Sequence, residues 1–142
     1  MTAPLDNLVR IGQLKLEPPA DEEIASYLRK ASIYLRDAAL EGMSSAGRFM
    51  LAYDAAHSLA FAALRAKGYR PDASRGHRAV VFQTLEATVA APKGLWVALD
   101  RYHTRRNASE YAGMVEASAA EADDLLELAR QLEALCKRAF GG

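Results

Sequence analysis

Apolar residues recur at intervals of three and four along most of the chain, the spacing that places them on one face of an α-helix. Alanine is abundant while Val, Ile and Thr are sparse, which favours helix over strand. Prolines and glycines lie between the periodic segments, where they interrupt helical structure. The pattern predicts an all-α protein, an up-and-down bundle of four to five helices. We place these helices at residues 21–41, 45–67, 76–90, 93 to about 104–107, and 118–138.

One helix start carries a capping box, in which Ser118 is followed three residues later by Glu121. In this motif the serine side chain and the glutamate side chain each accept a hydrogen bond from the other residue's backbone N–H. The fifth helix should therefore begin at Ser118. Residues 105–117 are then a long connection, since about two to eight residues are usual between the helices of a bundle. The alternative is that the fourth helix continues through Tyr111.

Chain length and proline positions indicate an N-terminal arm, residues 1–19, followed by a single helical domain, residues 20–142. Pro18 and Pro19 block helix up to that point, so we expect the arm to be loosely held. Several apolar side chains would still let part of it dock on the domain: Leu5, Leu8, Val9, Ile11, Leu14 and Leu16.

The charges are balanced overall but segregated along the chain. Lys and Arg number 18, as do Asp and Glu, so the formal net charge is zero. A strong nucleic-acid binder usually has a basic excess, so here such a surface must come from local basic stretches, at residues 65–78 and 101–106. Residues 110–133 are acidic apart from Arg130. Zero net charge also lowers the barrier to self-association, and we expect a homodimer.

The sequence is typical of a cytoplasmic protein. Its single cysteine, Cys136, cannot form an internal disulfide, which fits a reducing compartment. The first ten residues lack the basic run and apolar core of a signal peptide. No apolar run approaches the ~18 residues of a transmembrane helix, so we expect no association with a membrane.

The sequence predicts no metal site and no cofactor. The histidines are His57, His77 and His103, and no two have the i, i+4 spacing of a helical zinc pair. The glycine-rich loops that hold nucleotide phosphates in common folds are absent from the sequence. The order of its Ser, His and Asp residues does not suggest a catalytic triad.

The densest polar cluster lies at residues 101–107, near the end of the fourth helix, and its sequence is RYHTRRN. One interpretation is that these cations compensate the helix dipole, which favours positive charge at this end. The other is a phosphate site, because guanidinium binds phosphate bidentately. Arg105 and Arg106 would then bind the phosphate, and Asn107 and Tyr111 would add neutral donors.

Three segments of the chain resemble a HEPN (higher eukaryotes and prokaryotes nucleotide-binding) domain, and the resemblance extends over residues 20–138. AYDAAHSLAFAALRAKGYRP is similar to the alanine- and aromatic-rich second helix and turn of that family. GHRAVVFQTLEAT is similar to the helix that follows the turn, and RRNASEYAGM resembles the polar element after the fourth helix.

The resemblance implies a helical bundle that forms homodimers and associates with nucleic acid. Such proteins often occur beside a small nucleotidyltransferase in toxin–antitoxin or defence systems, and many are metal-independent ribonucleases. Their motif is an arginine, often followed by asparagine, with a histidine four to six residues after the arginine. Arg106 and Asn107 match its start, but Tyr111 stands where the histidine would be. Tyrosine ionises near pH ~10 and histidine near ~6.5, so Tyr111 is a poor general base at neutral pH.

Three hypotheses follow. The first, which the sequence favours, is a non-catalytic HEPN-like dimer that binds a nucleotide, RNA or a partner protein through Arg105, Arg106, Asn107 and Tyr111. The second is a metal-independent ribonuclease toxin that uses Arg106 with Tyr111 or His103. The third is a purely structural interaction module, such as an adaptor for a nucleotidyltransferase antitoxin.

Overall fold

The computed structural model describes residues 3–72, 80–111 and 116–140, and for residues 108–111 it describes the backbone alone. In this part of the chain seven helices and a small two-stranded sheet are present, so the fold is mostly helical, with more and shorter helices than expected. The helices are α1 (Ala3–Arg10), α2 (Asp21–Ala38), α3 (Ser45–Ala66), α4 (Val80–Gln83), α5 (Leu85–Val89), α6 (Lys93–Tyr111) and α7 (Ala119–Phe140). The strands are β1 (Leu14–Leu16) and β2 (Tyr69–Pro71).

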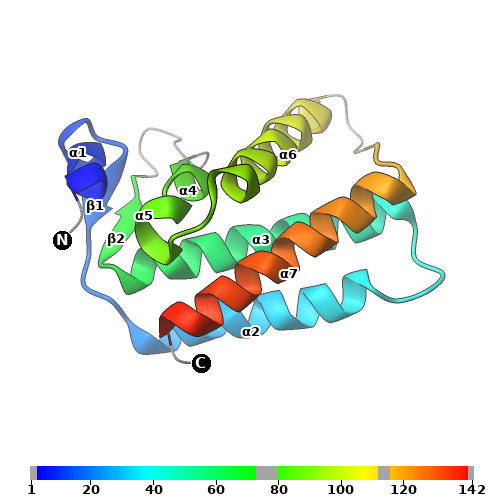
Figure 1. Ribbon diagram of the computed structural model, residues 1–142, viewed down its shortest axis with the longest axis horizontal. Coiled ribbons are helices and arrows are strands. Elements are labelled where there is room, and N and C mark those ends of the chain that lie inside the picture. Colours follow the sequence, from blue (N-terminus) through cyan, green and yellow to red (C-terminus); the bar gives the residue numbers. More distant parts are fainter. Residues whose placement is uncertain (1–2, 73–79, 112–115, 141–142) are drawn as a thin grey trace.

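Helix α3 forms the centre of the bundle. It packs against α2 and α7, and on its other side against α4, α5 and α6 (Figure 1). Its alanines let the neighbouring helices approach closely, and a helix that is apolar on most sides is typical of such a central position. The main core gathers around it, and its largest members include Phe49, Leu59, Phe82, Leu99, Leu125 and Leu132.

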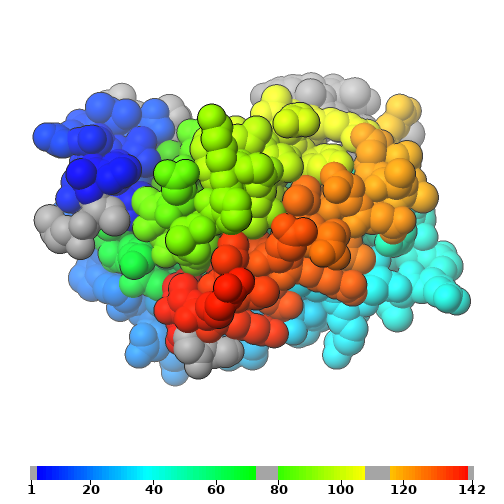
Figure 2. Space-filling view, in the orientation of Figure 1, coloured from blue at the N-terminus to red at the C-terminus, as the bar shows by residue number. Residues whose placement is uncertain are grey.

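The N-terminal arm is folded, so the expectation that it is loosely held is wrong. Strand β1 pairs antiparallel with β2, with Leu14 opposite Pro71 and Leu16 opposite Tyr69. Together with α1 it covers a second core cluster, formed by Leu5, Leu14, Leu64, Tyr69 and Val80. Figure 2 shows the arm, in blue, in close contact with the neighbouring green segments. The prolines do not prevent this packing because they follow β1 in the chain.

A buried arginine fastens the arm to α3. The side chain of Arg65 is 1% exposed and forms an ion pair with Glu23, Nε to Oε1 at 2.7 Å. Its Nη1 donates to the backbone oxygens of Glu17 (2.9 Å) and Tyr69 (3.2 Å). Its Nη2 donates to the backbone oxygen of Pro18 at 2.8 Å. These acceptors satisfy the buried guanidinium, as a buried charge requires.

Arg70 extends this network toward the surface. It forms ion pairs with Glu17 and Glu23, each at 2.7 Å. The hydrogen bond from Arg70 is the largest cause of a lowered pKa of Glu17. For Glu23 the hydrogen bonds from Arg65 and then Arg70 lower the pKa of the carboxyl group. The residues on either side of Pro18 and Pro19 are therefore held by charge as well as by backbone pairing.

Two helices begin at the serine caps that the sequence predicts. The backbone N–H of Gly47 donates to Ser44 Oγ at 3.0 Å, which caps α3. The capping box before α7 is confirmed, because the N–H of Glu121 donates to Ser118 Oγ (3.1 Å) and the N–H of Ser118 to Glu121 Oε1 (3.0 Å). Helix α6 continues through Tyr111, so the connection is shorter than residues 105–117 and the alternative interpretation is correct.

The third predicted helix, residues 76–90, is divided. Thr84 separates α4 from α5, and its Oγ1 donates to the backbone oxygen of Val81 at 2.8 Å. Threonine side chains compete for backbone groups in this way, which weakens a continuous helix. Ala90, with φ of 56°, ends α5 in the left-handed conformation. The predicted start of this helix lies outside the described residues.

Among the helices of the described residues, none combines the length and the apolar character that crossing a membrane requires.

Candidate functional site

Helix α6 turns His103 and Arg106 toward Tyr53, on the central helix α3. Residues three and four apart lie on one face of a helix, so His103, Arg106 and Asn107 are neighbours. His103 is 4% exposed. Its Nδ1 lies 2.5 Å from the hydroxyl oxygen of Tyr53, and Phe82 packs edge-on against its ring with centroids 5.7 Å apart.

Hydrogen bonds connect these side chains in a defined direction. Nη1 of Arg106 lies 3.4 Å from Oδ1 of Asn107, to which it donates. The amide nitrogen of Asn107 lies 3.1 Å from Nε2 of His103. An amide NH2 group only donates, so Nε2 accepts and the neutral imidazole carries its proton on Nδ1. That proton is donated to the hydroxyl of Tyr53, and both ring nitrogens of His103 are used.

Two arginines lie over successive aromatic rings of α3. The guanidinium carbon of Arg106 lies 5.0 Å from the ring centroid of Tyr53. One turn earlier on α3, that of Arg105 lies 5.6 Å from the centroid of Phe49. Arginine is attracted to aromatic faces at such distances. The rings therefore hold both guanidinium groups against α3.

Arg105 also has acidic and carbonyl partners, which join α6 to the start of α7. It forms an ion pair with Glu121 and donates to the backbone oxygen of Glu116. Nearby, the hydroxyl of Tyr102 donates to Asp124 at 2.6 Å. Burial, then that hydrogen bond, raises the pKa of Tyr102 to about 12. Arg105 thus has a structural role whatever else it binds.

Asp54, directly after Tyr53, is a charged residue of this region that sequence reasoning missed. Its side chain is half-buried. Burial raises the pKa of the carboxyl group, while the charges of Lys30 and Arg106 oppose that change. Within the described residues its carboxylate forms no hydrogen bond or ion pair. The only sequence signal is an acid within an alanine-rich helix.

The predicted site residues are thus partly assembled. Arg106, Asn107 and His103 lie together beside Tyr53. Arg105 lies over the ring of Phe49, which is one turn earlier on α3 than Tyr53. Tyr111 is the last residue of α6, and its side chain lies outside the described residues. No group of three His, Cys, Asp or Glu side chains suited to a metal ion occurs in the described ranges.

Comparison with known proteins gave no match for this chain, whether with family models, curated proteins or solved structures.

Proposed function

We propose that the chain is a HEPN-like protein that binds a nucleotide or RNA, without cleaving it, through the phosphate-binding pair Arg106 and Asn107. The observation that carries this proposal is the chain of hydrogen bonds from Arg106 through Asn107 and His103 to Tyr53. It fixes an arginine and an amide side by side on one face of α6. Guanidinium and amide N–H groups are the donors that phosphate oxygens prefer.

Prior positioning supports binding at this site. Arg106 is half-buried and lies over the ring of Tyr53. A side chain that is already held loses less conformational freedom when a ligand arrives. The second nucleic-acid contact that we propose is Tyr111, at the end of the same helix. Arg105 is the weaker member of the predicted set because Glu121 already neutralises much of its charge.

Burial of His103 supports binding without catalysis. A general base must come within hydrogen-bond reach of the proton that it removes. Both nitrogens of His103 already have partners in the protein, and its ring is buried. His103 therefore acts as a positioning residue for Asn107.

The proposed assembly is a homodimer, with a nucleotidyltransferase antitoxin as a further protein partner. Large apolar side chains remain exposed on α2 and in the turn that follows it, namely Ile33, Leu40 and Met43. We propose that these side chains contribute to the contact between the two chains. Sedimentation at micromolar concentration should give a dimer of the 15.4 kDa chain, and a monomer alone would contradict the assembly.

The binding proposal is tested with a fluorescent single-stranded RNA and two arginine variants. Arg106→Ala should weaken binding about 10- to 140-fold, since one charge-assisted contact contributes roughly 1.5–3 kcal/mol. Arg130→Ala, at an exposed position of α7, should bind like the wild type. Equal affinities of the two variants would contradict the site. If the wild type binds neither RNA nor a nucleotide, the purely structural interaction module becomes the better account.

A further inference from the structure

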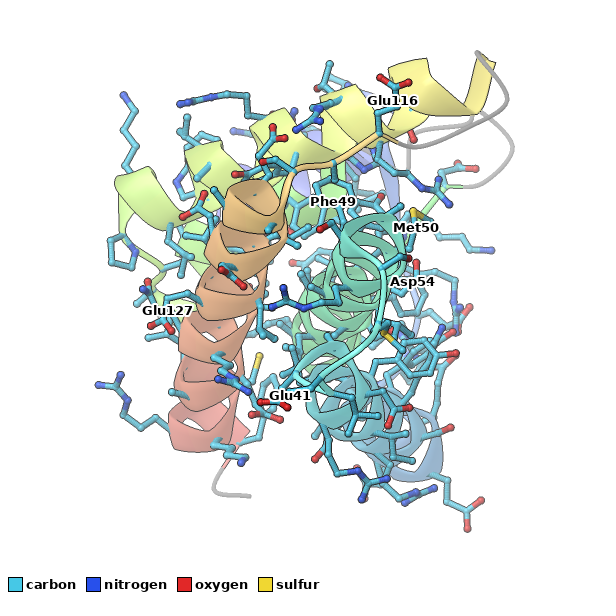
Figure 3. The ribbon with its side chains drawn as sticks, turned by 90° about the vertical axis from the view of Figure 1, so that its right-hand side faces the viewer. Glu41, Phe49, Met50, Asp54, Glu116 and Glu127 are labelled. Carbon is cyan, nitrogen blue, oxygen red and sulfur yellow. The ribbon has the colours of Figure 1, made fainter. Side chains whose placement is uncertain are left out.

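A small cavity lies where α2, α3 and the last turns of α7 meet. Helix α3 packs closely against both other helices, whereas α2 and α7 touch one another only in part. Figures 1 and 3 show α7 beside the pair formed by α2 and α3. The space that remains among the three helices has a volume of about 80 Å³. Protein interiors contain few voids larger than a water molecule, so this space is a distinct feature of the bundle.

Small side chains on two helices leave the cavity unfilled. Leu28 and Ser32 line it from α2, and Cys136 and Phe140 line it from α7. The members of each pair are four residues apart, so they lie on one face of their helix. In each pair one side chain is large and the other small. The small ones, Ser32 and Cys136, leave open the space that a longer side chain at either position would occupy.

The inner wall of the cavity is apolar and buried. Leu59 of α3 and Cys136 line it, and each is 1% exposed. The thiol of Cys136 donates to the backbone oxygen of Leu59 at 3.8 Å. Burial, and then the charge of Glu133, raises the pKa of Cys136 to about 12. The thiol therefore stays protonated at neutral pH and is a poor nucleophile, so this wall offers apolar contacts and no covalent attachment.

The outer edge of the cavity is polar but has no net charge. Ser32 and Lys137 line the cavity and are exposed, so they mark its mouth. Glu133, one turn earlier on α7, forms an ion pair with Lys137, Nζ to Oε1 at 3.9 Å. An anion or a cation at this edge would meet one like charge as well as one opposite charge. A neutral hydroxyl group can both donate to and accept from Ser32.

We propose that this cavity binds a small neutral aliphatic molecule, with its carbon chain against Leu59 and Cys136 and a hydroxyl group beside Ser32. An apolar cavity of about 150 Å³ binds benzene, so the smaller volume here suits a chain of about three or four carbon atoms. A ligand in the cavity restores the dispersion contacts that its lining lacks. The lining residues belong to α2, α3 and α7, so the site is separate from the proposed phosphate site on α6.

The experiment is titration of the full chain with straight-chain primary alcohols from methanol to hexanol, followed by NMR spectroscopy of the leucine methyl groups. Each methylene group that enters the cavity should tighten binding about fourfold. The gain should end at propanol or butanol, because further carbons remain in solvent. The methyl signals of Leu28 and Leu59 should shift to saturation. Butyrate and butylammonium should bind more weakly than butanol, since each brings a like charge to the ion pair at the mouth.

Variants with a longer side chain in the cavity should lose this binding. Ser32→Leu, at the exposed mouth, should weaken butanol binding by about 15-fold, the loss expected when two methylene groups no longer fit. Cys136→Met should do the same from the inner wall. Ser26→Leu makes the same change at another exposed position of α2 and should bind like the wild type. Ser32→Leu decides the matter if Cys136→Met does not fold, because an exposed position tolerates the longer side chain.

Three results would overturn the proposal. The first is the absence of saturable butanol binding at concentrations that leave the protein folded. The second is an affinity that keeps rising through hexanol, which indicates an open apolar surface, or one that Ser32→Leu leaves unchanged. The third is tighter binding of butyrate or butylammonium than of butanol, which contradicts a neutral ligand. A gain that ends at propanol or butanol and is lost in Ser32→Leu but kept in Ser26→Leu supports the site.

Discussion

The hydroxyl of Tyr53 lies 2.5 Å from Nδ1 of His103, which joins the middle of α3 to the middle of α6 inside the bundle. Only buried groups meet at this contact, since Tyr53 and His103 are each 4% exposed. The hydrogen bonds continue from His103 to Asn107 and Arg106, on the face of α6 where we propose that phosphate binds. A buried polar pair therefore sets the position of the proposed site.

Loss of the Tyr53 hydroxyl should lower both stability and binding. Tyr53→Phe leaves Nδ1 of His103 without this partner in a buried position, which should reduce the free energy of unfolding by about 1–3 kcal/mol. RNA affinity should fall as well, because Asn107 is held through His103. Urea unfolding and RNA titration measure the two effects. Tyr102→Phe removes a hydrogen bond that is exposed to solvent and should cost less stability. A larger loss for Tyr102→Phe would contradict the account.

Replacement of Arg65 should release the arm. Arg65→Met keeps an apolar stem but leaves the backbone oxygens of Glu17, Pro18 and Tyr69 without this donor. We expect a loss of about 3 kcal/mol or more in the free energy of unfolding, together with faster amide exchange of β1. Arg29→Met, at an exposed position of α2, should change stability by less than about 0.5 kcal/mol. Unchanged exchange in β1 would contradict the role of Arg65 as the fastening residue.

The ion pairs of Arg65 and Arg70 with Glu23 should make the free energy of unfolding depend on pH in the acidic range. Hydrogen bonds from Arg65 and then Arg70 lower the pKa of Glu23 below its ordinary value of 4.5. A lowered folded-state pKa contributes stability that is fully present above the unfolded value and is lost as the pH falls through the folded value. Glu23→Gln should therefore flatten the loss of stability below about pH 4.5. Urea unfolding across a pH series tests this, with Glu22→Gln, exposed on the same turn, as the control. Parallel curves for wild type and Glu23→Gln would be inconsistent with it.

The helices could be predicted from sequence because their signals are local. Ser118 and Glu121 are three residues apart, and their mutual hydrogen bonds follow from that spacing. The arm could not be predicted in this way. Strand β1 pairs with β2, and the two strands are separated in the sequence by all of α2 and α3. In addition, strands of three residues are too short for a periodicity that would distinguish them from a loop.

The candidate site was predictable along α6 but not across the bundle. Arg106 and Asn107 are adjacent in the sequence and match a short motif. Tyr53 belongs to another helix, and its place beside Arg106 depends on how α3 and α6 pack. The burial of His103 has the same origin, because a helix pattern alone does not show which polar residue faces the core.

The proposed HEPN-like motif has a tyrosine in place of its histidine, and this gives a prediction about catalysis. The purified protein should cleave RNA slowly or not at all near pH ~7, because a tyrosine with its ordinary pKa of ~10 is a poor general base there. Tyr111→His restores an imidazole five positions after Arg106 and should increase cleavage. In that background, Arg106→Ala should remove the gain. Robust cleavage by the wild type that Tyr111→Phe abolishes would instead favour the ribonuclease toxin.

The central claim is that Arg106 binds phosphate, and the salt dependence of RNA affinity tests it most directly. Each cation that neutralises a phosphate of single-stranded RNA releases counterions and steepens the dependence of log affinity on log salt by about 0.7. Arg106→Ala should therefore give a line shallower than the wild type by about that amount, while Arg130→Ala should give a line parallel to the wild type. A line for Arg106→Ala that is parallel to the wild type would contradict the claim.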